Sequence, residues 1–363
     1  MADFYEALFV AKVLGEGGGI ISVDSWYNVR QIVNRGLAKK YFKVGDQLAC
    51  MRSGEKLIWD IVNIAADGTA ITLLLHETMP DLVFSARQAV FAFPDGLAAG
   101  EYHFTVSQQP FFAGDVGKTI SFTLTQAIPA GGQLVLNNAY NASMIGATIS
   151  SFASQTATTA IETMTMSEGS GGTDLGSLTN AGTPASNINS IQRASLGSNN
   201  WRESAQRQVM NSDKPAGQVW TPQTIFDRPP AWVNNTAGFI NGLDEDFVSV
   251  VTPTTYTTVN NIVSDGGGEY TLTDKFYLPS RTEIFGTNEL ANYPEGTQYA
   301  YYVGATDADR IKYRAGSARS WRLRTPYTTN AYSVRIVYPT GAISHYNATT
   351  ALGWSPACRI AKS

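Results

Sequence analysis

The chain has 363 residues, a charged fraction of only 15% and a formal net charge of −4 at pH 7. This length is enough for two or three domains with sizeable cores, and the low charge together with 33 glycines favours a protein rich in strands and loops. The acidic balance argues against a nucleic-acid partner, which would need a basic face.

No apolar run approaches the roughly 20 residues that a membrane-spanning helix needs, so we expect no membrane insertion. The first residues, 1–19, lack a basic region followed by an apolar core and therefore predict no secretion signal. Both observations indicate a protein made in a cytoplasm.

The first predicted element is a helix that begins at Asp24-Ser25. Trp26, Val29 and Ile32 follow at helical spacing. The next segment has apolar runs separated by turn residues, which is typical of hairpins. Its expected strands are 47–51, 57–64 and 70–75.

Residues 93–138 have a purely β pattern, with expected strands at 101–106, 119–125 and 133–136. Residues 141–187 are rich in Ser, Thr, Gly and Ala, so they are either a flexible linker or an ordered, extended excursion. Apolar residues such as Ile149, Phe152 and Met164 favour the ordered excursion.

Helix signals return after residue 199. Asn200 and Glu203 have the spacing of a capping box, and Ser280 and Glu283 have it again. Residues 239–247 also have helical spacing. The last 45 or so residues resemble hairpins, and Tyr338-Pro-Thr-Gly341 has the composition of a type I turn.

The sequence contains few signals of catalysis. His76, His103 and His345 are scattered, and no metal-spaced pair or nucleophile motif is present. Asp244-Glu245-Asp246 could bind a cation, although a solvated or helix-terminal acidic patch is favoured. We therefore expect no enzyme, no cofactor and no metal site.

Two further pairs have alternative interpretations. Cys50 and Cys358 could form a disulfide only if the two ends of the chain meet, and two buried reduced thiols are favoured. Arg322 and Arg324 flank Leu323 and could clamp an anion, but a structural ion pair is favoured.

A series of short motifs in the second half of the chain occurs in a characteristic order. The motifs are Asn189-Ser-Ile-Gln-Arg193, Gly197-Ser-Asn-Asn-Trp201, Ser204-Ala-Gln-Arg207, Trp220-Thr-Pro-Gln-Thr224, Phe226-Asp-Arg-Pro-Pro230, Lys275-Phe-Tyr-Leu-Pro-Ser280, Trp321-x-Leu-Arg324-x-Pro326 and Gly353-x-x-Pro-Ala357. Together they resemble a C-type-lectin-like family of phage and prophage virion proteins, related to the formylglycine-generating-enzyme type of lectin fold. The resemblance covers residues 188–360, and residues 43–87 more weakly.

The resemblance implies an α+β fold: a C-type-lectin-like domain with an inserted small β-sandwich lobe and an N-terminal helical segment. The implied boundaries are 1–42 for the helical assembly segment, 43–92 for the first lectin-like strands, 93–187 for the insertion, and 188–363 for the main domain. The calcium-dependent sugar motifs of true C-type lectins are absent from the sequence.

Many members of this family are targets of diversity-generating retroelements, which rewrite adenines in a C-terminal variable region, here 317–360. The residues that an altered AAC codon can encode alternate in this region with residues typical of the family's framework. The resemblance therefore implies a ligand-binding face made of Tyr332, Ser333, Ile336, Tyr338, Ser344, His345, Tyr346, Asn347, Thr349, Thr350, Leu352 and Trp354.

The leading functional hypothesis is a phage receptor-binding protein on the tail or capsid surface of a virion. Its expected partners are a protein or glycan on the host cell surface, other virion proteins, and further copies of itself, such as a trimer. The alternative is a head-decoration or baseplate protein without a receptor role. A glycan hydrolase would need a cleft with paired carboxylates, which the sequence does not reveal.

Overall fold

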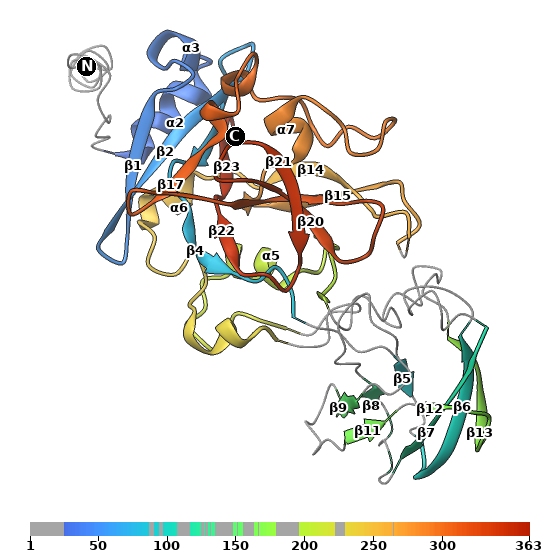
Figure 1. The fold of residues 1–363 in the computed structure, drawn as a ribbon. Helices are drawn as coiled ribbons and strands as arrows, with labels where there is room; N and C mark the ends of the chain where they lie inside the picture. Colours follow the sequence, from blue (N-terminus) through green and yellow to red (C-terminus); the bar gives the residue numbers. More distant parts are fainter. Residues whose placement is uncertain are drawn as a thin grey trace.

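In the computed structural model, two five-stranded sheets form the main body of the protein (Figure 1). The structure describes residues 25–86, 91–93, 97–106, 117–124, 127, 130, 132–134, 148–150, 152–154, 163–165, 167–178, 196–221, 229–263 and 265–363. The expected motifs at 189–193 and 226–228 and the N-terminal residues 1–24 lie outside this described part.

The first sheet joins early and late segments of the chain. Its order is β1 (Gln47–Arg52), β2 (Glu55–Ile64), β3 (Ala70–Leu75), β23 (Ala357–Ala361) and β16 (Phe276–Tyr277). The predicted strands at 47–51, 57–64 and 70–75 are confirmed, and β3 is buried along its whole length. β23 pairs antiparallel with β3, with Cys358 opposite Leu73, so the sheet is completed by residues almost 300 positions apart.

The second sheet carries the C-terminal hairpins. Its order is β21 (Ile343–Asn347), β20 (Ser333–Val337), β19 (Trp321–Pro326), β22 (Leu352–Trp354) and β4 (Met79–Leu82). β19 and β22 are parallel, and the other neighbours are antiparallel. The Tyr338–Gly341 turn joins β20 to β21 as predicted, because the Gly341 N–H donates to the Tyr338 carbonyl at 2.8 Å.

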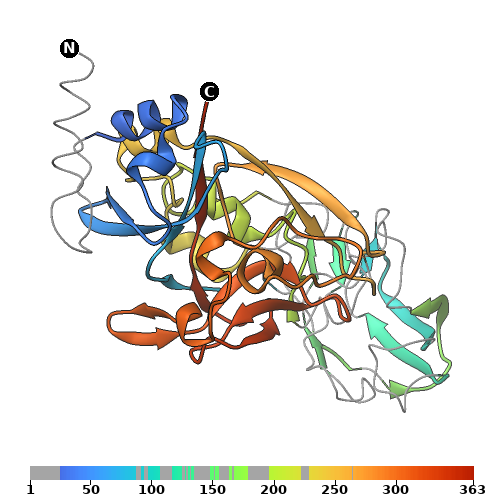
Figure 2. The same cartoon turned by 90° about the horizontal axis from the view of Figure 1, so that it is seen from above.

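The described helices are short. They are α2 (Trp26–Asn34), α3 (Ala38–Tyr41), α5 (Ala205–Met210), α6 (Glu245–Val250) and α7 (Arg281–Phe285), with 3-10 turns η3 (Ala231–Asn235), η4 (Ala300–Tyr302) and η5 (Ala308–Arg310). None of these helices has the length and apolar character that crossing a bilayer requires. Seen from above, the blue helices α2 and α3 lie at the end of the main body that is far from the green strands (Figure 2).

Helix starts were predicted with mixed success. The Ser25 side chain accepts from the Tyr27 N–H at the start of α2, and Ser280 with Glu283 forms the predicted capping box of α7. The box expected at Asn200 is wrong, because Ser204 caps α5 instead. Asn200 accepts from the N–H of Arg202, two residues on, which stabilises a turn before the helix.

The expected α+β class with a C-type-lectin-like domain is wrong, and the protein is β-rich. Strands dominate the described residues, and the longest described helix, α2, has only nine residues. The physical reason is that the helical signals after residue 199 extend for one or two turns only. At residues 239–247, for example, α6 begins at Glu245, and Phe239 lies in the preceding loop.

Residues 91–178 contribute several small sheets that lie beside the main body in both views (Figures 1 and 2). The described strands are β5 (Phe91–Phe93), β6 (Gly100–Val106), β7 (Thr119–Leu124), β8 (Gly132–Leu134), β9 (Thr148–Ser150), β10 (Phe152–Ser154), β11 (Thr163–Thr165), β12 (Ser167–Glu168) and β13 (Thr173–Leu178). The largest sheet has the order β12-β7-β6-β13. The predicted strands at 101–106 and 119–125 match β6 and β7, whereas most of the excursion at 141–187 lies outside the described residues.

Two further hairpins, β14 (Thr254–Val259) with β15 (Glu269–Asp274) and β17 (Lys312–Arg314) with β18 (Ser317–Arg319), complete the fold. β14 runs beside β19, so it lies next to the C-terminal sheet. The acidic run at 244–246 lies at the start of α6, where Asp244 accepts the Met51 N–H at 2.6 Å. This position confirms the interpretation of a helix-terminal acidic patch.

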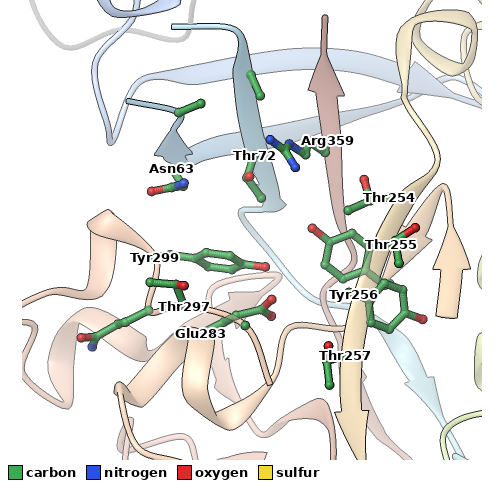
Figure 3. Close-up of a pocket in the computed structure, with 15 residues that line it drawn as sticks. Asn63, Thr72, Thr254, Thr255, Tyr256, Thr257, Glu283, Thr297, Tyr299 and Arg359 are labelled. Atoms are coloured by element: carbon green, nitrogen blue, oxygen red, sulfur yellow. The ribbon is translucent and has the colours of Figure 1, made fainter. Parts of the chain in front are cut away.

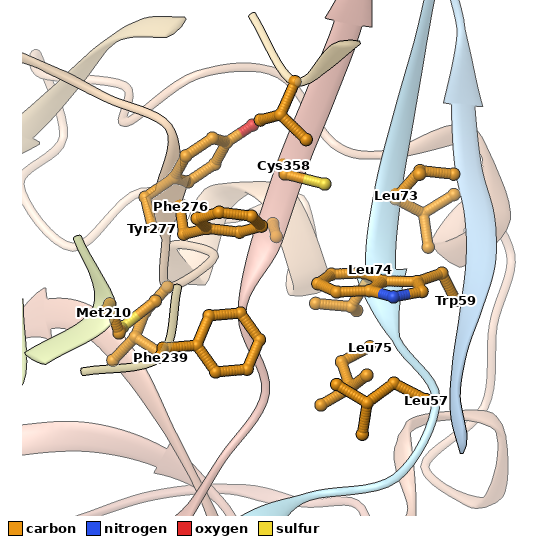
Figure 4. Close-up of a cluster of buried hydrophobic side chains, with 14 of the residues drawn as sticks. Leu57, Trp59, Leu73, Leu74, Leu75, Met210, Phe239, Phe276, Tyr277 and Cys358 are labelled. Carbon is orange, nitrogen blue, oxygen red and sulfur yellow. The ribbon is translucent and has the colours of Figure 1, made fainter. Parts of the chain in front are cut away.

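An aromatic cluster forms the core between the first sheet and the helices (Figure 4). The Trp59 ring on β2 lies 5.2 Å from Phe247 of α6 and 6.4 Å from Phe239. Phe239 in turn contacts Phe276 at 5.2 Å and Trp354 at 5.4 Å. Such pairs contribute about 0.5–1.5 kcal/mol each beyond the area they bury. Because Trp354 belongs to β22, the cluster couples the two sheets.

The two cysteines are free and buried, which confirms the interpretation as reduced thiols. Cys50 lies on β1 and Cys358 on β23, and strands β2 and β3 separate them in the sheet order. Burial raises the pKa of Cys50 to about 12, although a hydrogen bond from Trp59 at 3.2 Å opposes this effect. Burial also raises the pKa of Cys358.

We therefore expect neither thiol to react with a disulfide reagent in the folded protein at neutral pH, because only the thiolate is nucleophilic. The measurement is the rate of thiol release in native buffer, compared with the same protein in denaturant, where both cysteines should react at once. Rapid reaction of either cysteine before unfolding would contradict the burial described here.

Candidate functional site

The predicted ligand-binding residues lie on and around the hairpin of β20 and β21. β21 is the edge strand of its sheet, and it pairs with β20 so that Tyr346 lies opposite Val334 and His345 opposite Arg335. Residues opposite each other in an antiparallel pair share one face. The hairpin therefore presents two faces of different character.

Four of the predicted residues are buried, so the structure gives them packing roles in place of the expected exposed contacts. Tyr332 is 6% exposed, Ser333 2%, Ile336 0% and Trp354 3%. The Trp354 indole N–H donates to the Pro80 carbonyl at 2.9 Å. The Ser333 backbone N–H donates to the side-chain oxygen of Asn330 at 2.7 Å. Codon logic could not separate Tyr332, Ser333 and Ile336 from exposed residues, because it ignores the direction of the side chain.

Tyr338, Ser344 and Tyr346 form a polar aromatic surface at one face of the hairpin. The Tyr338 and Tyr346 rings meet edge to face at 5.9 Å, and Tyr346 is 38% exposed. Hydrogen bonding with Ser344 and Tyr346 lowers the pKa of Tyr338. We call Tyr338, Ser344 and Tyr346 the tyrosine face.

The opposite face of the hairpin is a stack of three side chains. The His345 ring stacks on the Tyr327 ring, with their centres 4.1 Å apart and an interplanar angle of 16°. The Arg335 guanidinium lies 4.3 Å from the centre of the Tyr327 ring. Glu289 accepts two hydrogen bonds from Arg335, at 2.7 and 2.9 Å. Burial and the nearby Arg335 charge lower the pKa of His345, so its imidazole is neutral at pH 7.

Neither Tyr327 nor Arg335 is among the site residues predicted from the sequence. One signal could have found the arginine. Once the Tyr338–Gly341 turn fixes the register, Arg335 lies directly opposite His345. Tyr327 gives no such signal, since it comes from the loop after β19.

The remaining predicted residues are half-buried: Asn347 ends β21, Thr349 and Thr350 lie in the loop that follows, and Leu352 begins β22. Arg322 fixes the backbone of this loop by donating to the carbonyls of Asn347 at 2.9 Å and Thr350 at 2.5 Å. The backbone of this loop is thus fixed, while its side chains remain partly accessible.

Arg322 and Arg324 occupy different environments, although both are fully buried. Arg324 forms a bidentate ion pair with Glu283, at 2.6 and 3.1 Å, which confirms the structural interpretation for this residue. Among the described residues Arg322 has no carboxylate partner, and its Nε and Nη1 atoms make no hydrogen bond. Burial lowers the pKa of Arg322 to about 9.

Within the described part of the chain, no group of three His, Cys, Asp or Glu residues is arranged to hold a metal ion. The histidines have separate surroundings: His76 lies 2.9 Å from Asp60, His103 accompanies Asp174 at 3.7 Å, and His345 stacks on Tyr327. The three histidines therefore share no common site in the part of the chain that the structure describes.

Comparison with known proteins places the second half of the chain in a family. Residues 178–362 match the family described as a domain of unknown function, DUF6273, and the chain belongs to this family. The matched segment contains the whole C-terminal sheet except β4. No curated protein and no solved structure matches the chain.

Proposed function

We propose that this protein attaches to a ligand on a bacterial cell surface through the tyrosine face of the β20–β21 hairpin. The observation that supports the proposal is the pair of adjacent, partly exposed rings of Tyr338, where the turn begins, and Tyr346, on the edge strand β21. Tyrosine gives a large contact area and a hydroxyl at a low cost in conformational entropy, as in antibody loops.

A firmly held backbone supports the same proposal. The hairpin pairs along all five residues of β20 and β21, and Arg322 holds the following loop by its carbonyls. A rigid framework lets exposed tips vary without loss of the fold. The positions that vary in this proposal are the accessible ones: Tyr338, Ser344, His345, Tyr346, Asn347, Thr349, Thr350 and Leu352.

The role on a virion and the host cell as the target are proposed from the resemblance of residues 188–360 to phage virion proteins. In this role the protein is carried on the virion with other virion proteins, in several copies, and meets a protein or glycan of the host. Several copies strengthen weak contacts because the later ones bind at a high effective concentration.

Replacing Tyr338 and Tyr346 together by Ala is expected to abolish attachment with little change in melting temperature. Both side chains are accessible, so their loss removes contact area and leaves the core intact. A panel of bacterial strains is first screened for one that the unaltered protein binds. The measurement is then the fraction of each fluorescently labelled variant that sediments with cells of that strain.

Two control variants make the test specific. Tyr313→Ala removes a ring that is 47% exposed on β17, away from the hairpin, and should leave attachment unchanged. Tyr332→Ala removes a buried ring and should lower the melting temperature. Normal attachment by the double variant would refute the proposal and favour a structural role in the virion.

A further inference from the structure

A second candidate binding site lies away from the hairpin, in a cavity of about 320 Å³. Strands β3 and β23 of the first sheet form one wall, β14 forms another, and the segments around α7 and η4 form the floor (Figure 3). Its volume is at the lower end of the range of about 300–1,000 Å³ that ligand pockets occupy. The space therefore suits a ligand of monosaccharide size.

Arg359 supplies a positive charge to this cavity. It lies on β23 opposite Thr72 of β3, and Figure 3 shows its guanidinium and the Thr72 side chain side by side at one wall. Among the described residues no carboxylate lies within ion-pair distance of Arg359. Its charge contributes the smallest of the effects on the pKa of Asp67. An arginine without an ion pair at a cavity wall offers a fork of donors that matches a carboxylate.

Tyr299 supplies a buried hydroxyl on the other side of the cavity. The residue is 6% exposed, and its hydroxyl makes no hydrogen bond of normal geometry, although the Tyr277 side chain is near. Burial raises its pKa, so the group stays protonated and can donate. An unsatisfied buried hydroxyl costs stability unless a ligand or water meets it.

Glu283 also lines the cavity, but its charge is already balanced. Arg324 holds both of its carboxylate oxygens, and the Ser280 N–H donates to one of them at 2.8 Å. Among the charged side chains that line the cavity, Arg359 is therefore the one without an ion-pair partner in the described part of the chain. Side chains of Thr72, Thr297 and Asn63 add polar groups that suit the hydroxyls of a ligand.

We propose that this cavity binds a small, hydroxyl-rich carboxylate, a sugar acid, with its carboxylate on Arg359 and a hydroxyl on Tyr299. The tyrosine rings at its walls give the flat apolar surface on which a sugar ring packs. This site is separate from the tyrosine face, and its occupation does not depend on the attachment proposed above.

The test is calorimetric titration of the full chain with glucuronate, galacturonate and N-acetylneuraminate, and with glucose and galactose as neutral counterparts. At least one sugar acid should bind at millimolar concentration or tighter, at least about tenfold tighter than the neutral sugars. Arg359→Gln and Tyr299→Phe should each weaken this binding by about tenfold or more.

Control variants separate the cavity from other effects. Lys362→Gln removes an exposed positive charge just beyond β23 and should leave binding unchanged. The double Ala variant of Tyr338 and Tyr346 should also bind the sugar acid normally, even though it no longer attaches to cells. Tyr299→Phe should keep its melting temperature, since the lost hydroxyl makes no hydrogen bond of normal geometry.

The proposal is overturned if none of the three sugar acids binds at millimolar concentration, or if the neutral sugars bind equally well. It is also overturned if both cavity variants bind like the unaltered protein. A variant that loses cell attachment but still binds the sugar acid would have lost the function of the tyrosine face and kept that of the cavity.

Discussion

Replacing Arg324 by Leu is expected to lower the free energy of unfolding by about 3–5 kcal/mol, because it leaves a buried carboxylate without its partner. The guanidinium also donates to the carbonyls of Leu278 at 2.9 Å, Glu295 at 3.0 Å and Thr257 at 3.1 Å. It thus ties α7 and β14 to the C-terminal sheet. Denaturant titration monitored by tryptophan fluorescence measures the loss.

Two companion variants test the reason for this loss. Adding Glu283→Gln to Arg324→Leu should restore part of the stability, because the unpaired charge of Glu283 is then gone while Glu295 still lacks the nearby Arg324 charge. Arg322→Leu should cost less than Arg324→Leu, since Arg322 has no carboxylate to leave unpaired among the described residues and two of its nitrogen atoms make no hydrogen bond. Equal losses for the two arginine variants would show that the ion pair is not the cause.

The second large effect is expected at Gly341, in the turn of the candidate binding hairpin. Its φ of +87° lies in the left-handed region, and a Cβ there would collide with the Asp307 carbonyl oxygen. Gly304 is the matched control: its φ is +76°, and nothing lies within 4 Å of the corresponding Cβ. Gly304→Ala should cost about 1–2 kcal/mol from backbone strain alone.

Gly341→Ala should cost about 1–3 kcal/mol more than the control, because the turn must move away from the Asp307 loop. Thermal unfolding of the two variants gives the comparison. If the tyrosine face binds as proposed, Gly341→Ala should also weaken cell attachment, since Tyr338 begins the same turn. Similar melting temperatures for both alanine variants would contradict the close approach of the two loops.

The sequence predicted local elements better than their faces. The strands at 57–64 and 70–75, the helix that begins at Ser25 and the capping box of Ser280 all depend on residues close together in the chain, and all are confirmed. The overall class was wrong because the amphipathic stretches after residue 199 form only the short helices α5, α6 and α7, and strands dominate the rest of the described fold.

The candidate site was predicted in part. Residues 332–354 do gather on one sheet. Ile336 shares a face with Ser344 and Tyr346, but it is buried on the inner strand β20, whereas Tyr346 on the edge strand β21 stays accessible. The cavity of Arg359 and Tyr299 was not predicted at all. Its walls come from segments near residues 63–72, 254–257, 283–299 and 359, and one sequence contains no signal that brings such distant positions together.

The position of β23 has a consequence for how the protein is made. β3 needs β23 to cover its edge, and about 280 residues are translated between the two strands. A growing chain therefore carries an apolar strand with an unpaired edge until residue 361 has left the ribosome. Such an edge is a template for aggregation, and pairing over a long sequence distance is slow. Folding of the first sheet is thus expected to wait until β23 has been translated, and chaperones that shield β3 should raise the yield.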